Sequence, residues 1–284
     1  MPWHKGLLVK TYIDEAFISV VFTWQLQEAF QRAVWLAHEG YSVMAGGPAV
    51  KLMPDFLAEV AEIPPECGEL RPLVGHNPDA TFTSRGCIRK CPFCAVPKIE
   101  GDLVEFERWP IRPIVCDNNL LACSRKHFDT VIDWLKPVKG VDFNQGLDAR
   151  LLTKHHADRL AELDCTVRLA WDNTHMESSF MAAYERLRAA HIPKRRIQCY
   201  VLIGYDDTPD DARYRLTTIR NLGILPNPMR FNPLDAMVRD YYVAPNWTER
   251  ELTRFMRYWA NLRFTAAVPF EEFDEARVVG PRRG

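Results

Sequence analysis

The sequence predicts an α/β fold in which a small N-terminal α/β segment precedes a larger region of six βα units. From residue 79 onward, short β-rich runs alternate with runs whose apolar residues recur at spacings of three and four, a pattern typical of parallel strands covered by helices. Residues 1–78 repeat this alternation on a smaller scale. A chain of 284 residues with 47% hydrophobic and 26% charged residues is long enough to bury a sizeable core.

The N-terminal segment, residues 1–78, is expected to form a strand, a helix and a second strand. The strand is predicted at 17–23, the helix at 25–38, ending before Gly40, and the second strand at 41–45, followed by a Gly-Gly-Pro turn. This order resembles half of a Rossmann-like nucleotide-binding domain, although the segment is too short for a complete one. The proline-rich stretch 63–72 is interpreted as its exit linker.

The larger region, residues 79–264, is expected to hold six strands, and residues 265–284 are interpreted as a C-terminal tail. The strands are predicted at 80–84, 113–117, 141–145, 167–172, 197–204 and 228–234. Two helix starts are well marked. Thr208 precedes a proline and two acidic residues, and Thr248 with Glu251 forms the pattern of a capping box.

Three cysteines, Cys87, Cys91 and Cys94, follow the first predicted strand with the spacing C-x3-C-x2-C. Thiolates are the usual protein ligands of iron–sulfur clusters, and a cubane held by three of them keeps one iron open. Zinc sites usually combine two close pairs of Cys or His roughly 12–20 residues apart, and Cys116 and Cys123 are spaced too widely to form a second pair. The spacing favours a 4Fe-4S cluster, with a zinc-stabilised module that binds nucleic acid as the alternative.

The remaining five cysteines are scattered along the chain. They are Cys67, Cys116, Cys123, Cys165 and Cys199. Most have apolar neighbours, where a free Cys behaves as a small buried hydrophobic residue, so we assign them no chemistry.

The segment from Cys87 to Cys94, CIRKCPFC, resembles the cluster motif of the radical S-adenosylmethionine (SAM) superfamily, including the aromatic Phe93 before the last cysteine. The resemblance implies that the open iron binds the amine and carboxylate of SAM, that one electron cleaves the sulfonium, and that a 5′-deoxyadenosyl radical abstracts hydrogen from a substrate. It further implies a partial (βα)6 TIM-like barrel with the cluster loop after its first strand, and an electron donor such as a flavodoxin or ferredoxin.

Ligands of such folds gather at the carboxyl ends of the parallel strands, so polar residues there are candidate cofactor contacts. Asp117 and Asn118 follow the second strand and offer acceptors for the methionine amine, or else form an Asx turn. Asn144 and Gln145 belong to a dense polar group after the third strand. Phe93 completes this set from the cysteine motif.

Two further candidates lie on the fourth and fifth predicted strands. Arg168 stands within an apolar alternation and needs a partner, either the SAM carboxylate or one of Asp148 and Asp172. Gly204 and Asp207 resemble the superfamily's I-x-G-x-x-E motif, which contacts adenine, with Asp in place of Glu.

The turn Gly46-Gly47-Pro48 looks like the end of the cobalamin-binding half found in one radical SAM subgroup. The segment is shorter than a full cobalamin domain and lacks the D-x-H-x-x-G motif that supplies an axial ligand. We therefore expect a degenerate domain without cobalamin, and a cobalamin-dependent radical SAM methyltransferase stays an alternative.

Charge and hydropathy define the expected surroundings. A formal net charge of −1 gives no overall attraction to nucleic acid or anionic membranes, although the basic residues 194–196, Arg282 and Arg283 leave RNA contact open. The longest apolar run, 16–24, is much shorter than the roughly 20 residues of a membrane helix, and the N-terminus lacks a signal-peptide pattern. We expect a cytoplasmic enzyme with no membrane partner, whose substrate is a small molecule, a peptide or RNA.

Overall fold

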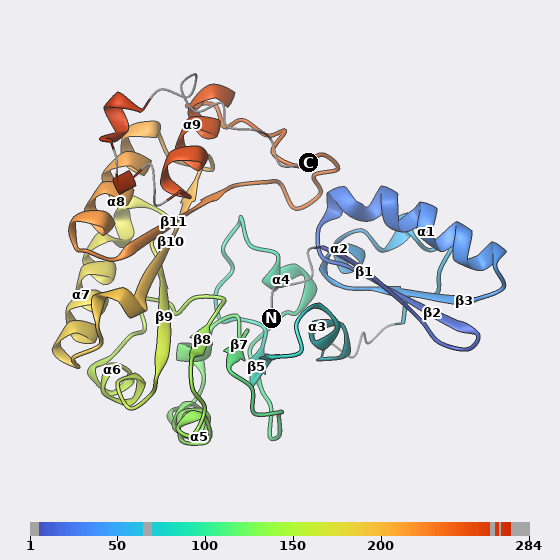
Figure 1. Cartoon of the computed structure of the whole chain (residues 1–284), viewed down its shortest axis with the longest axis horizontal. Coiled ribbons are helices and arrows are strands. Elements are labelled where there is room, and N and C mark those ends of the chain that lie inside the picture. Colours follow the sequence, from blue (N-terminus) through green and yellow to red (C-terminus); the bar gives the residue numbers. More distant parts are fainter. Residues whose placement is uncertain (1–5, 65–69, 262–264, 267, 274–284) are drawn as a thin grey trace.

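The computed structural model describes residues 6–64, 70–261, 265–266 and 268–273. It confirms the α/β class, with a three-stranded sheet, a six-stranded parallel sheet and a two-stranded ladder among these residues. The three-stranded sheet and its helix form an N-terminal unit, residues 6–64, which lies at one side of the larger sheet in Figure 1.

The N-terminal unit consists of β1 (Leu7–Thr11), β2 (Glu15–Val20), α1 (Leu26–His38) and β3 (Ser42–Gly46). The strand–helix–strand order of β2, α1 and β3 is as expected, and β2 pairs with β3 in parallel. The preceding strand β1 was not expected, and it adds an antiparallel edge to β2. Its apolar run is only three residues long, and its side chains are partly buried or exposed at the edge of the sheet.

The predicted linker is partly helical, because α3 (Leu70–His76) occupies its end. The buried His76 ring lies 3.1 Å from the Ser19 hydroxyl, Nε2 to Oγ, which fixes α3 against β2. A short helix α2 (Pro48–Leu52) follows the glycine turn. The N-terminal unit is therefore attached to the larger region through side-chain contacts as well as through the chain.

The six-stranded sheet has the order β11-β10-β9-β8-β7-β4. Its strands are β4 (Ala80–Thr81), β7 (Ile114–Val115), β8 (Val141–Phe143), β9 (Cys165–Ala170), β10 (Ile197–Ile203) and β11 (Leu225–Arg230). All neighbours pair in parallel. Since the spatial order follows the chain order, every carboxyl end lies at the same edge.

Two strand predictions need correction. The first strand is shorter than expected, because Ser84 turns away to pair with another segment. The sixth strand covers 225–230 rather than 228–234. Pro226 and Pro228 lie within β11, which has a neighbour on one side only, and an edge strand tolerates residues without an N–H donor.

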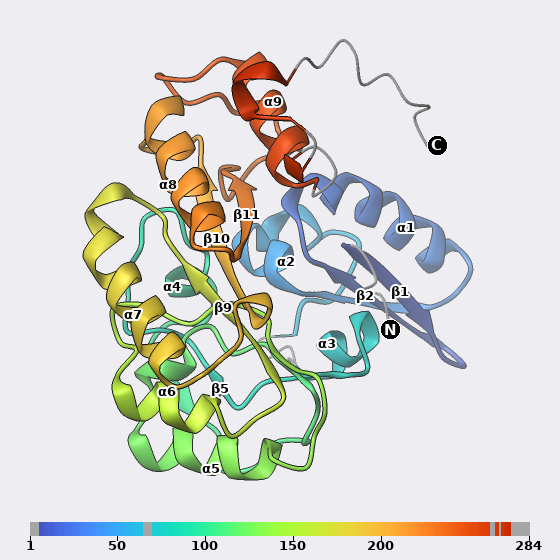
Figure 2. The same cartoon turned by 60° about the vertical axis from the view of Figure 1, so that its left-hand side comes forward.

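Five helices follow strands of this sheet. They are α5 (Arg125–Leu135), α6 (Lys154–Leu160), α7 (Glu177–Ala189), α8 (Pro209–Asn221) and α9 (Glu249–Trp259). The capping boxes at Thr208 and Thr248 are confirmed, and α8 and α9 lie against β11 (Figure 2). None of the helices in the described ranges is both long and apolar enough to cross a membrane.

Candidate functional site

The three cysteines lie on one loop, residues 86–103, which we call the cysteine loop. Its ends are joined by β5 (Ser84–Arg85) and β6 (Val104–Glu105), which pair antiparallel. Gly86 has a φ of +75°, and a Cβ there would lie 2.0 Å from the carbonyl oxygen of Asp102. Cys87 N–H donates to Gly101 O at 3.2 Å. Only glycine fits where the two ends of the loop meet.

Glu100 organises the base of the cysteine loop from inside. Its side chain is 5% exposed and accepts hydrogen bonds from Arg85, from Gly86 N at 3.0 Å and from Asn118 Nδ2. These donors come from the start of the loop and from the residues after β7, while Glu100 itself lies near the end of the loop. Glu100 therefore fixes the loop relative to the sheet, a role for which the sequence offers no motif.

The cysteine loop and the carboxyl ends of three neighbouring strands enclose a cavity of about 180 Å³, the cysteine cavity. From the loop it is lined by Cys87, Arg89, Cys91, Phe93, Cys94 and Val96. From the strand ends it is lined by Asn118, Asn119, Gln145, Gly146, Leu147, Asp148, Arg150, Ala170 and Asp172, and Met176 completes it. The structure thus brings six predicted site residues together: the three cysteines, Phe93, Asn118 and Gln145.

The three thiols are free and half-buried. Arg89 N–H and Asn119 Nδ2 both donate toward Cys87 Sγ, at 3.3 and 3.5 Å. Burial raises the pKa of Cys91, which the charge of Arg150 opposes, and burial likewise raises the pKa of Cys94. Metal binding displaces the protons of such thiols. The Arg89 and Asn119 N–H donors suit a negatively charged Cys87 sulfur.

Charged side chains from the loop after β8 form the wall beside Cys91. Arg150 donates to both oxygens of Asp148, at 2.7 and 3.0 Å, and Arg89 Nε donates to Asp148 at 3.1 Å. Burial opposes ionisation of Asp148, but the bonds and charge of Arg150, with the charge of Arg89, hold its pKa below the usual value. One carboxylate thus shares two guanidinium groups, and the wall carries net positive charge.

Two further lining residues, Asn119 and Asp172, offer acceptors. Asn119 is 3% exposed, and its Oδ1 is a buried oxygen with no hydrogen-bond partner in the described structure. Asp172, at the end of β9, forms no hydrogen bond with any described residue. Burial raises its pKa, and the charges of Arg215 and Arg150 oppose this. An orphaned buried acceptor costs about 1–3 kcal/mol, so a ligand with N–H donors would be stabilised here.

Two predicted residues lie in buried networks outside the lining. Asp117 accepts from Thr83 N at 2.6 Å and from Ser84 Oγ at 2.9 Å, so it holds the start of the cysteine loop. Asp207 accepts from Gly204 N and from Trp247 Nε1, both at 2.9 Å. Gly204, with a φ of +72°, therefore contributes its backbone N–H to this network.

Arg168 and Asn144 also lie outside the lining. Both expected protein partners of Arg168, Asp148 and Asp172, need correction. Arg168 donates to both oxygens of Asp142 on β8, at 2.7 and 2.6 Å, and to Gln198 on β10 at 2.9 Å. Parallel pairing places these neighbours beside it, a register that the sequence alone does not fix. The Asn144 carbonyl oxygen accepts from the Tyr200 hydroxyl at 2.8 Å.

The residues predicted from the sequence leave out much of the cavity wall. Arg89, Asp148 and Arg150 lie in segments that the sequence marked as polar, while Asn119 directly follows two predicted residues. Asp172 was considered as a partner for Arg168, not as a lining residue. Their positions depend on which side chains turn inward after each strand ends, and loops lack the strand alternation that predicts this.

The donor set fits an iron–sulfur cluster in its chemistry. Across the described ranges, no three His, Cys, Asp or Glu side chains are arranged to hold a single metal ion. A cubane takes its ligands at different irons, so thiolates that serve one need not meet at a point. Three free thiols in one cavity, with two donors aimed at the Cys87 sulfur and cations beside Cys91, suit an anionic cluster.

The other described cysteines lie elsewhere as buried thiols. They are Cys116, Cys123, Cys165 and Cys199. Burial raises the pKa of Cys116, Cys123 and Cys165 to about 12 in each case, which suits inert core residues. Cys67 and the basic residues Arg282 and Arg283 lie outside the described residues.

The cysteine cavity thus brings together six of the predicted residues, while the other five lie outside its lining. No protein-family model matches the sequence, and no curated protein matches it.

Proposed function

We propose that the chain is a radical SAM enzyme, in which Cys87, Cys91 and Cys94 hold a 4Fe-4S cluster and the neighbouring strand ends hold SAM. The observation that carries the proposal is the convergence of three free thiols on one cavity at the carboxyl ends of parallel strands. Open α/β sheets bind their ligands at this edge. We further propose that the six-stranded sheet is the wall of a partial (βα)6 barrel.

A bound cluster would supply an electron to the sulfonium of SAM and an open iron for its amino-acid end. The residues of this chain would bind and orient both groups. Arg89 N–H and Asn119 Nδ2 donate toward Cys87 Sγ, and hydrogen bonds to cluster sulfurs raise the reduction potential. Arg150 places positive charge beside Cys91, which stabilises a thiolate there.

The polar lining divides into acceptors and donors that match an amino acid. Asn119 Oδ1 and the Asp172 carboxylate offer acceptors for an ammonium group. Arg150 and Arg89 offer guanidinium groups for a carboxylate, which arginine binds well. This arrangement supports the methionine end of SAM as the ligand near the cysteines, and moves the expected contacts from Asp117 and Arg168 to Asn119 and Arg150.

Reconstitution tests the proposal directly. We expect the full chain, treated anaerobically with iron and sulfide, to hold about four irons, and to convert SAM into 5′-deoxyadenosine when dithionite supplies electrons. Cys91→Ala should abolish both iron binding and cleavage. Cys165→Ala is the matched control, because Cys165 is a buried thiol that lines no part of the cysteine cavity.

Two outcomes would contradict the enzyme. Stoichiometric zinc without the visible absorption of an iron–sulfur chromophore would favour the zinc-stabilised module. Iron binding and cleavage that persist in Cys91→Ala would show that the chemistry does not depend on this loop.

A further inference from the structure

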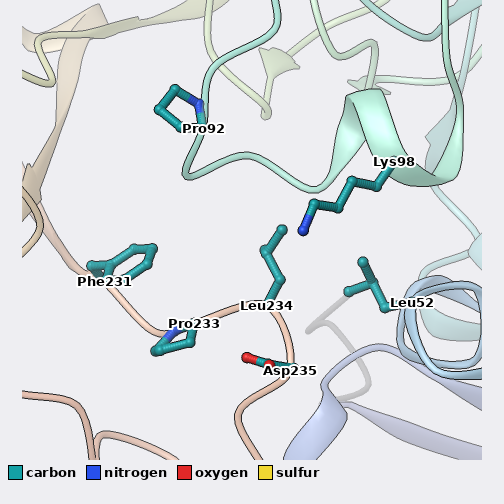
Figure 3. Close-up of a pocket in the computed structure, with 7 residues that line it drawn as sticks. All are labelled: Leu52, Pro92, Lys98, Phe231, Pro233, Leu234 and Asp235. Atoms are coloured by element: carbon teal, nitrogen blue, oxygen red, sulfur yellow. The ribbon is translucent and has the colours of Figure 1, made fainter.

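A second cavity, of about 250 Å³, lies on the other side of the cysteine loop. It is lined by Leu52, Pro92, Lys98, Phe231, Pro233, Leu234 and Asp235 (Figure 3). Three distant parts of the chain therefore build it: the end of α2, the cysteine loop with α4 (Val96–Ile99), and the loop that follows β11.

The second cavity adjoins the cysteine cavity. Pro92 lines one of them, while Cys91 and Phe93 on either side of it line the other. The Phe93 ring contacts Tyr205 at 5.4 Å between centroids, and Tyr205 contacts Phe231 at 4.7 Å. One residue of the loop and a row of three aromatic rings thus separate the two cavities.

The loop that follows β11 is fixed in its conformation by hydrogen bonds. Thr23 Oγ1 of the N-terminal unit donates to Ala236 O at 2.6 Å, and both residues are buried. Asp240 N donates to Asn232 Oδ1 at 2.7 Å, which closes the loop on itself. Arg230 Nη2 donates to Asp240 O at 2.5 Å. A wall fixed at both ends is preorganised for a ligand.

The lining combines partly buried apolar side chains with one exposed charge of each sign. Leu52, Phe231 and Leu234 provide the apolar surface, and in Figure 3 Leu234 lies between the Lys98 ammonium and the Asp235 carboxylate. Neither Lys98 nor Asp235 forms an ion pair with a described residue. A ligand that complements this lining has an apolar group, an anionic group for Lys98 and a cationic group for Asp235.

We propose that the second cavity is the substrate site, and that the substrate is a free amino acid with an apolar side chain. Its carboxylate pairs with Lys98, its ammonium group pairs with Asp235, and its side chain packs on Leu234 and Phe231. The role of this ligand as the molecule from which the radical abstracts hydrogen rests on the proposed function. Its binding to the second cavity does not. The N-terminal unit then has a purpose in the reaction, because Leu52 and the Thr23 contact complete the site.

Calorimetry with three probes tests the site. L-Phenylalanine carries both charges, 3-phenylpropionate lacks the amine, and 2-phenylethylamine lacks the carboxylate. We expect Lys98→Met in the full chain to weaken L-phenylalanine and 3-phenylpropionate about tenfold while leaving 2-phenylethylamine unchanged. Asp235→Asn should weaken L-phenylalanine and 2-phenylethylamine instead. Lys154→Met is the control, since Lys154 is exposed and pairs with Asp158 on its own helix.

The proposal is overturned if L-phenylalanine does not bind the folded wild-type chain, or if both variants weaken all three probes equally. Measuring SAM cleavage on the same reconstituted samples separates the two proposals. Binding with the expected pattern but without cleavage contradicts the radical SAM assignment alone. Cleavage without binding contradicts the substrate site alone.

Discussion

The ion pair between Asp207 and Arg215 is the most enclosed pair of charges described in the molecule. The Arg215 side chain is fully buried, and it donates to Asp207 at 2.5 Å and to the carbonyl oxygens of Trp171 and Leu202, both at 2.9 Å. Through its hydrogen bonds to these two carbonyl oxygens, Arg215 links β10 to the end of β9. A guanidinium in this position depends on Asp207 for its charge balance.

Replacing Asp207 tests this structural role. Asp207→Ala leaves the Arg215 charge buried and unpaired, and we expect it to lower the free energy of unfolding by about 3–5 kcal/mol. Urea denaturation measures the loss. Asp206→Ala is the control, because Asp206 is adjacent but exposed, and it should have almost no effect. If Asp207→Ala unfolded like the wild type while SAM binding was lost, Asp207 would be a nucleotide contact after all.

Gly86 and Gly101 provide a matched pair for the closure of the cysteine loop. Their φ angles are +75° and +74°, but a Cβ would meet the Asp102 carbonyl oxygen only at Gly86. We expect Gly101→Ala to cost about 1–2 kcal/mol from backbone strain alone, and Gly86→Ala to cost clearly more and to reduce iron content. Thermal unfolding and iron analysis check both. Equal losses of stability and iron in the two variants would show that the Asp102 carbonyl oxygen moves aside at no cost.

At the scale of elements, helices α5 and α6 are joined by a network of charges around Arg159. Arg159 donates to Asp129 and Asp133 on α5, at 3.1 and 2.6 Å, and to Glu162 beyond the end of α6 at 2.6 Å. Lys136 also bonds Asp133 and Glu162, at 2.9 and 2.8 Å. Hydrogen bonds from Lys136 and Arg159 hold the pKa of Glu162 below its usual value.

This network should make the free energy of unfolding depend on pH in the acid range. A carboxyl whose pKa is lowered on folding stabilises the folded state above its unfolded pKa of about 4, and loses that effect as the pH falls through the lowered value. We expect Arg159→Met to reduce the free energy of unfolding at pH 7 and to have much less effect at pH 3. Arg32→Met, which removes an exposed pair with Glu28 within one helix, is the control. An Arg159→Met effect that is the same at both pH values would contradict the linkage.

The elements differ in how well the sequence predicted them. Helices α8 and α9 were marked by residues whose local hydrogen bonds decide the boundary, such as Thr208 and Thr248, so their starts were predictable. Strand β11 begins at Leu225, three residues before the predicted start, because prolines fit a strand only at a free edge, and which edge is free is a property of the assembled sheet. Helix starts that depend on local hydrogen bonds could be predicted from the sequence, whereas the pairing of strands could not.

The same distinction applies to the site. Cys87, Cys91 and Cys94 were identified by spacing, and the structure brings them to one cavity. Arg168 was misassigned because its partner Asp142 lies 26 residues away on the next strand, and register is set by the tertiary fold. Glu100 was missed because its donors Arg85, Gly86 and Asn118 lie 14 to 18 residues away along the chain and leave no pattern in the sequence.

At the scale of the molecule, one buried hydrogen bond connects the N-terminal unit to the loop after β11. Thr23→Val removes the donor and leaves the Ala236 carbonyl oxygen buried without it, which should cost about 1–3 kcal/mol. We also expect faster proteolysis within residues 231–243. Thr130→Val is the control, because the Thr130 hydroxyl bonds an exposed carbonyl within its own helix. Unchanged cleavage in Thr23→Val would show that the loop is held by other contacts.

The order of strands in the sheet also has a consequence during synthesis. Each strand that leaves the ribosome finds its neighbour already made, because the sheet grows from β4 to β11 in chain order. The three cysteines emerge directly after β4, before β7, β8 and β9 have supplied the walls that half-bury them. Domains fold as the nascent chain lengthens, so these thiols are most exposed before translation of the chain is finished.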